Sequence, residues 1–206
     1  MSRRAEQKNA TRHAIVQAAL RLSAERGFSS LSLRGIASEA GIAPTSFYRH
    51  FKNIDDLGLA LVDEVGLSLR QLVREARRRV ADRDCTSITR ASIETFMEFV
   101  ETDATLFRLL LGEGAGSTAP FRRGIAKEIA RFTDDLSDDL TAAAAEMGKP
   151  LANVGLAAEA MVTIAFNLGA AAIDLTDAER ADVVDRIITE VRMVMRGAQA
   201  EAAASK

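Results

Sequence analysis

Residues 41–52 read GIAPTSFYRHFK and combine two kinds of side chain in one short segment. Pro44 favours the first position of a helix, and Gly41 is suited to ending the helix before it. Phe47 and Phe51 are four residues apart, so they share one face of such a helix. The opposite face carries Thr45, Tyr48, Arg49 and Lys52, with Ser46 and His50 on the flanks. The segment is therefore predicted to be a short helix with an apolar anchor on one side and hydrogen-bond donors on the other.

A second short helix is predicted immediately before this one, with Ser32 as its N-terminal cap and Gly41 at its end. Two short helices joined by a tight turn form a helix-turn-helix, and a helix of this kind fits the major groove of DNA. Hydroxyl and cationic side chains can reach phosphate oxygens or base edges there. The predicted DNA contacts are Ser32, Arg34, Thr45, Ser46, Tyr48, Arg49, His50 and Lys52. The alternative is a surface helix whose polar face meets only water.

The charge distribution favours a polyanionic partner for the N-terminal part of the chain. Residues 1–52 hold nine Lys or Arg residues against three Asp or Glu residues, a net charge of +6. The remaining residues carry a net charge of −8, so the overall value of −2 hides this asymmetry. A basic segment on an acidic body is typical of nucleic-acid binding, although chance clustering of solvated charges gives the same count.

The composition predicts a helical, intracellular protein. The 206 residues suffice for one or two domains, and only three are proline. The single cysteine, Cys85, cannot form an internal disulfide, which favours a reducing cytoplasm. The N-terminus has no apolar signal core, and the longest apolar run is interrupted by Glu159, so we expect no membrane span.

Helical periodicity continues to the end of the chain, and no strand alternation is evident. Asn53 and the Thr176–Glu179 pair are predicted helix caps. A Gly-rich loop is expected at 112–120, and the tail after Gly197 is expected to fray. We expect an all-α fold of about nine helices, with a helix-turn-helix domain at 1–53 and a helical domain at 54–206. The predicted helices cover 10–26, 33–40, 44–52, 54–80, 87–101, 103–112, 119–147, 151–173 and 177–197.

The stretch FSSLSLRGIASEAGIAPTSFYRHFKNIDDL, residues 28–57, resembles the DNA-binding domain of TetR-family transcriptional repressors. Some dozen positions agree at fixed spacing over about residues 10–62. Within that family, the chain looks most like the FabR/DesT-type regulators of unsaturated fatty acid synthesis. The resemblance implies a cytoplasmic homodimer that binds palindromic operator DNA through helix-turn-helix heads. It also implies a ligand-binding body whose effector is a long-chain acyl thioester, acyl-CoA.

Six of the nine Phe residues lie between 96 and 166, where they can line a tunnel for an acyl chain. The predicted ligand contacts are Phe96, Phe99, Val100, Phe107, Leu110, Phe132, Met161 and Phe166, with Arg108, Arg122 and Arg123 as head-group contacts. The alternative is that these apolar residues are ordinary core. The last two helices are expected to form the dimer interface through Met161, Ile164, Leu168, Val184, Ile188, Val191 and Met195. The same stripes could instead face the core of their own subunit.

An enzyme is the rival class of function. The two histidines, His13 and His50, form no metal-binding pair, and no nucleophile elbow or phosphate-binding loop motif is present. The acidic cluster at 134–139 is interpreted as a solvated helix face rather than a metal site. We therefore predict a regulator with no catalytic residues, no metal and no cofactor. A repressor of efflux or catabolic genes that senses another apolar molecule remains the alternative.

Overall fold

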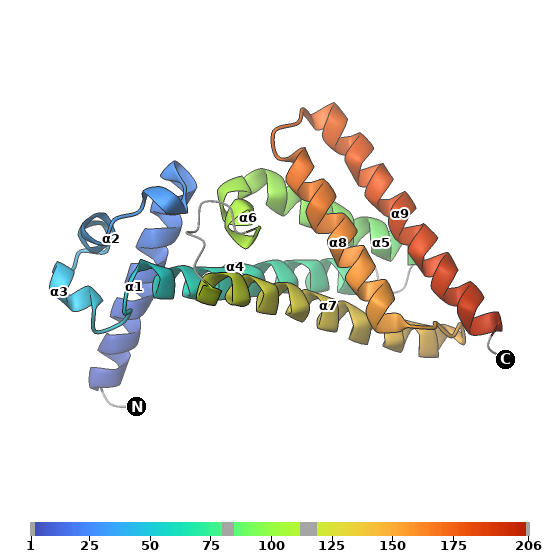
Figure 1. Ribbon diagram of the computed structural model, residues 1–206, viewed down its shortest axis with the longest axis horizontal. Coiled ribbons are helices and arrows are strands. Elements are labelled where there is room, and N and C mark those ends of the chain that lie inside the picture. Colours follow the sequence, from blue (N-terminus) through green and yellow to red (C-terminus); the bar gives the residue numbers. More distant parts are fainter. Residues whose placement is uncertain (1–2, 80–84, 112–118, 205–206) are drawn as a thin grey trace. The chain divides into compact units, whose positions relative to one another are not determined.

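The computed structural model describes residues 3–79, 85–111 and 119–204 (Figure 1). Within these ranges the chain forms nine α-helices and one short 3-10 helix, and it contains no strand. The all-α fold class is thereby confirmed. The elements are α1 (Arg3–Arg26), η1 (Phe28–Ser30), α2 (Leu33–Glu39), α3 (Pro44–Phe47), α4 (Ile54–Arg79), α5 (Cys85–Thr102), α6 (Ala104–Leu110), α7 (Ala119–Met147), α8 (Val154–Ala172) and α9 (Asp177–Ala204).

Several predicted helix ends are confirmed by their capping contacts. The N–H of Asp56 donates to Oδ1 of Asn53 at 2.8 Å at the start of α4. The N–H of Thr176 donates to Oε2 of Glu179 at 2.9 Å, and the N–H of Glu179 donates back to Thr176 Oγ1 at 3.5 Å. This reciprocal pair is the capping box predicted at the start of α9.

The lengths of the two terminal helices differ from the prediction. α1 begins at Arg3, seven residues earlier than expected, and α9 continues to Ala204 instead of fraying after Gly197. The Ala-rich sequence of the tail has high helix propensity, which explains its continuation. Most of the predicted Gly-rich loop, residues 112–118, lies outside the described residues.

The contacts divide the chain into two compact units, residues 1–68 with 103–125, and residues 69–102 with 126–206. α4 contributes its first part to one unit and its second part to the other. A division of the functional domains at residue 53 stays a prediction.

The first unit packs α1 against α2 and α6. Ile15, Ala18 and Ala19 of α1 are fully buried, as the sequence stripe predicted. Gly58 of α4 lies against the stacked rings of Phe28 and Phe121, whose centroids are 5.9 Å apart. A Cβ atom on Gly58 would lie 2.5 Å from the Phe28 ring and 2.7 Å from the Phe121 ring, so only glycine fits this close approach.

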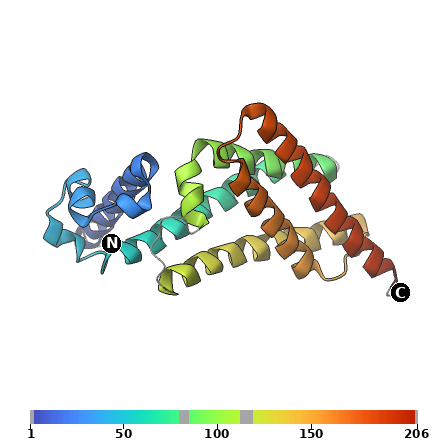
Figure 2. The same ribbon diagram turned by 45° about the horizontal axis from the view of Figure 1, so that its top comes forward.

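In the second unit, α8 and α9 lie side by side and both contact α5 (Figures 1 and 2). α8 is 19 residues long and apolar enough to pass a test for a membrane span by length and composition. The interruption by Glu159 does not prevent this, because one charge does not offset the surrounding apolar residues. The core helix of a soluble protein passes the same test, and the side of α8 that carries Ala158, Met161 and Ala165 is buried within this unit.

Candidate DNA-binding surface and candidate ligand cavity

The turn between α2 and α3 is formed as the sequence predicted. The N–H of Gly35 donates to Oγ of Ser32 at 3.1 Å, which caps the start of α2. After α2, Gly41 adopts a φ of 67°, a left-handed conformation that glycine tolerates without strain. The N–H of Ile42 then donates to the carbonyl of Ala37 at 2.9 Å and closes the end of α2. The chain is thereby free to begin α3 at Pro44.

The helical part of α3 is shorter than predicted. It ends at Phe47, and the chain continues through a hydrogen-bonded turn over residues 48–50. Lys52 lies beyond this turn, and its N–H donates to Oδ2 of Asp56 at 3.0 Å in the first turn of α4. The prediction that Lys52 belongs to the polar face of the same helix is therefore wrong, because α4 already holds its backbone.

The apolar anchor is confirmed. Phe47 is fully buried, Phe51 is 3% exposed, and their ring centroids lie 5.7 Å apart. The guanidinium of Arg12 lies 5.0 Å from the centroid of the Phe51 ring, which adds a cation–π contact between α1 and the turn. α3 itself packs against α2, and the Arg12–Phe51 contact joins α1 to the segment that follows the turn.

The polar side chains of this region remain available to a partner. Tyr48 is 63% exposed although its ring meets Phe47 edge-on at 6.0 Å. Ser46 and His50 are half-buried. The exposed members of the predicted DNA-binding set are Ser32, Arg34, Thr45, Tyr48, Arg49 and Lys52.

His50, one of the predicted DNA contacts, has an unusual environment. Its Nδ1 atom is buried without a hydrogen-bond partner among the described residues. Burial, together with the positive charges of Lys8, Arg12 and Arg49, lowers the pKa of His50 below its usual value of 6.5. The imidazole is therefore neutral at neutral pH, and the positive field around it comes from its neighbours.

The second unit contains an apolar cavity of about 700 Å³. Its wall is built from side chains of α4, α5, α7, α8 and α9. Phe96, Phe132 and Phe166 cluster in this wall, with ring centroids of Phe96 and Phe132 lying 5.5 Å and 5.3 Å from that of Phe166. Together with Met161, these are the predicted ligand contacts that the structure brings together around one cavity.

The other predicted ligand contacts do not line this cavity. Phe99 and Val100 are buried on α5 outside its wall. Phe107 and Leu110 are buried in the first unit, because α6 packs against α1. Arg108, Arg122 and Arg123 also belong to the first unit, and the last two are exposed. Their proposed role at a tunnel mouth stays a prediction.

Some of the residues predicted to form the dimer interface on α8 and α9 face the interior of their own subunit. Met161, Ile188 and Val191 are buried and line the cavity, and Met195 lines it as well. Ile164, Leu168 and Val184 are half-buried. The first four of these side chains line a cavity of their own subunit, as the alternative interpretation expected, and their part in a dimer interface stays a prediction.

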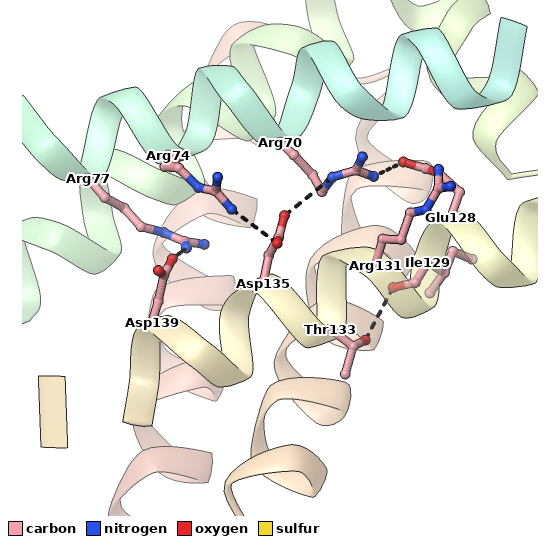
Figure 3. Close-up of polar contacts among 9 residues, drawn as sticks. All are labelled: Arg70, Arg74, Arg77, Glu128, Ile129, Arg131, Thr133, Asp135 and Asp139. Carbon is pink, nitrogen blue, oxygen red and sulfur yellow. Dashed lines mark hydrogen bonds and ion pairs between the residues drawn. The ribbon is translucent and has the colours of Figure 1, made fainter. Parts of the chain in front are cut away.

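A ladder of ion pairs between α4 and α7 was not anticipated (Figure 3). Arg70 pairs with Glu128 and Asp135, and Arg74 pairs with Asp135 at 3.0 Å. Arg77 pairs with Asp139 and donates to Oγ of Ser92 at 3.1 Å. Two carboxylates of the acidic cluster at 134–139, those of Asp135 and Asp139, thus form ion pairs with arginines of α4 instead of only facing solvent. The spacing of Arg70, Arg74 and Arg77 on one side of α4 could have predicted this ladder.

The cavity wall also contains a small polar group formed by Arg77, Asp139 and Ser92. These three side chains interact with one another, since Arg77 is bonded to both of the others. The part of the chain that the structure describes holds no group of three His, Cys, Asp or Glu side chains suited to a metal ion.

The sequence comparisons agree with this architecture. Residues 15–61 match the family of bacterial regulatory proteins described as the tetR family, and residues 85–197 match the tetracyclin repressor-like C-terminal domain. The chain therefore belongs to the TetR family of transcriptional regulators. Members of this family bind operator DNA as dimers.

Solved structures of transcriptional regulators share the fold at low sequence identity. FadR from Bacillus subtilis, solved in complex with stearoyl-CoA, is 19% identical with a TM-score of 0.66, over 90% of this chain and 98% of that one. The fatty acid degradation regulator FadR from Bacillus halodurans is 16% identical with a TM-score of 0.65, over 90% and 94%. A TetR-family regulator from Streptomyces coelicolor is 22% identical with a TM-score of 0.67, over 93% and 97%.

Proposed function

We propose that this chain is a repressor that binds palindromic operator DNA as a homodimer, with α3 and the start of α2 as its DNA-contacting elements. The observation that carries this proposal is the two-sided character of residues 44–52. Phe47 and Phe51 are buried, whereas Thr45, Tyr48 and Arg49 are exposed. Exposed hydroxyl and cationic groups on a firmly anchored element suit phosphate and base contacts. In a dimer, two such elements meet successive major grooves about 34–36 Å apart.

The effector of this regulator is proposed to be a long-chain acyl thioester, with target genes in unsaturated fatty acid or lipid synthesis. An elongated apolar cavity is the type of site that an acyl chain needs. The Bacillus subtilis relative was solved with stearoyl-CoA, which is a precedent for such a ligand on this fold. The FabR/DesT type of specificity follows from the sequence resemblance alone.

The proposed route of control runs through α4. Its first part belongs to the unit with the DNA-contacting elements, and Val73 and Arg77 in its second part line the cavity. An effector changes operator affinity only through its different affinity for the two states of the protein. A ligand that displaces the second part of α4 thus has a continuous helix through which to act.

The DNA-binding proposal is tested by substituting Tyr48→Phe and Thr45→Ala and measuring affinity for the preferred palindromic site. Each change removes a hydroxyl from an exposed side chain, so the fold should persist while affinity falls about fivefold to tenfold. Thr141→Ala is a matched control, since Thr141 is an exposed hydroxyl on α7, outside the proposed interface. Unchanged affinity in both test variants would exclude α3 as the reading element.

The effector proposal is tested by measuring operator affinity with saturated and unsaturated acyl thioesters present. A change of affinity with chain type supports a lipid sensor. If no acyl thioester alters DNA binding, an efflux or catabolic repressor with another apolar ligand becomes the better interpretation. Mass spectrometry of ligands that copurify with the protein would then identify that molecule.

A further inference from the structure

The cavity of the second unit has two chemically different ends. Its lining residues on α7 run from Phe132 to Met147, which corresponds to roughly 22 Å along the helix axis. At one end the wall is aromatic, with Phe132 and Phe166 packed edge-to-face. The other end is formed by the last turns of α7, the α7–α8 connection and the second half of α9. The cavity is therefore elongated, and a bound molecule has a defined direction within it.

Three cations lie at the second end. Lys149 lies in the α7–α8 connection, and Arg192 and Arg196 lie one turn apart on α9. The N–H of Ala152 donates to the carbonyl of Ala198 at 3.0 Å, which fixes the connection beside this part of α9 (Figures 1 and 2). Glu146 is the one carboxylate in the wall at this end, so the local charge is positive.

These cations differ from the other charged groups of the cavity wall. Arg77 is held by Asp139 and Ser92, so its charge is already paired within the protein. Lys149, Arg192 and Arg196 form no ion pair with any residue that the structure describes, and all three are exposed. An apolar molecule that ends in an anionic group would bury its chain among the aromatic rings and leave its charge beside these donors.

We infer that Lys149, Arg192 and Arg196 form the head-group site of the cavity and that the effector is a single-chain amphiphile with an anionic head. This inference deepens the proposed function, because it requires the cavity to be the effector site. It assigns the head group to α9 and the α7–α8 connection, not to Arg122 and Arg123 of the first unit. A fatty carboxylate and the phosphates of an acyl thioester share the chemistry that this site recognises.

The test uses the full chain and three probes with the same apolar chain, dodecanoate, dodecanol and dodecylamine, with binding measured by calorimetry. The expected order places dodecanoate about tenfold tighter than dodecanol, with dodecylamine weakest.

The double substitution Arg192→Gln with Arg196→Gln should remove most of the preference for dodecanoate while dodecanol binding is retained. Arg186→Gln on the outer face of α9 is the matched control, and Arg122→Gln with Arg123→Gln is the competing arm. Dodecanoyl-CoA distinguishes the two sources of the anion, since it gains affinity over dodecanoate only if the phosphates are recognised.

The possible outcomes distinguish a failure of the head-group site from a failure of the proposed lipid effector. Equal affinity for dodecanoate and dodecanol overturns the head-group site and leaves an apolar effector cavity in place. Loss of dodecanoate preference in the Arg122 and Arg123 variant, with none in the α9 variant, overturns the assignment to α9. Absence of binding for all probes overturns both the head-group site and the lipid effector.

Discussion

Arg77 of α4 forms an ion pair with Asp139 of α7 in the wall of the apolar cavity (Figure 3). Among the ion pairs between α4 and α7, this one is one of the more exposed, and the pair of Arg70 with Glu128 is the most buried. Glu128 is only 3% exposed at its side chain and Arg70 is 12% exposed, whereas Asp139 is 42% exposed. The two ion pairs should therefore differ in their contribution to stability, because solvent screens Arg77–Asp139 far more than Arg70–Glu128.

Substitution of Glu128→Gln should lower the free energy of unfolding by about 3 kcal/mol, because it leaves Arg70 partly unpaired in a buried position. Asp139→Asn should cost about 1 kcal/mol, since the site is more exposed. Urea denaturation at a fixed protein concentration measures both values. Asp138→Asn, an exposed neighbour on α7, serves as the control and should change little. Equal losses at positions 128 and 139 would contradict the gradient along the ladder.

Local patterns predicted the elements of the fold well. Gly41, Pro44, Asn53 and Thr176 each act through contacts within a few residues of the chain, and each appears where the sequence indicated. The length of α3 was overestimated: the helix ends at Phe47, and the backbone of Lys52 is bonded instead to Asp56 of the next helix, a contact that periodicity does not reveal.

Contacts between distant segments were harder to predict. Periodicity identifies an apolar face but not the helix that covers it, so Phe107 was interpreted as a ligand contact although it packs in the first unit. Ile188 was assigned to the dimer interface for the same reason, whereas it lines the cavity. The close approach of Gly58 to Phe28 and Phe121 joins three segments far apart in sequence, and no local pattern indicates it.

Substitution of Gly58→Ala should destabilise the protein by about 1–3 kcal/mol, because the new methyl group would overlap two buried aromatic rings. Gly197→Ala in α9 is the matched control, since no atom lies within 4 Å of its added Cβ. That change should be neutral or stabilise by up to about 1 kcal/mol through helix propensity. Thermal unfolding of both variants measures the difference. A Gly58→Ala protein as stable as the parent would mean that the rings of Phe28 and Phe121 can move apart at little cost.

The environment of His50 predicts a pH dependence of stability. Its pKa is lowered in the folded protein by burial and by Lys8, Arg12 and Arg49. In the unfolded chain the imidazole takes up a proton near pH 6.5, whereas the folded protein resists protonation until a lower pH. Stability should therefore fall as the pH drops below about 6.5 and level off once the folded form is also protonated.

His50→Gln should reduce this pH dependence, whereas His13→Gln, at an exposed position on α1, should retain it. The measurement is the midpoint of urea unfolding across the acidic range. A dependence that is the same in the His50→Gln variant and in the parent would assign it to other groups.

Contacts of Arg49 with operator phosphates should be visible in the salt dependence of DNA affinity. Replacing Arg49 by Gln should weaken binding similarly across operator sequences and reduce the slope of log affinity against log salt by about 1. Arg21→Gln on α1 is the control, because its guanidinium is held by Glu39 at 2.9 Å. If the slope stays constant in the Arg49 variant while sequence preference changes, Arg49 contacts bases rather than phosphates.

The proposed dimer should use the outward face of α8, since the inward residues are covered by their own subunit. Leu156 is 66% exposed, and Ala160 lies one turn further along the same side of the helix. In the proposed dimer, the outward faces of α8 from the two subunits pack against each other. Ala160→Glu would bury a charge in that apolar contact, so it should convert the dimer to a monomer and weaken operator binding. Light scattering coupled to size-exclusion chromatography measures the assembly state. Ala130→Glu, at an exposed position of α7, is the matched control and should remain dimeric. A dimer that persists in the Ala160→Glu variant would place the interface on another surface of the second unit.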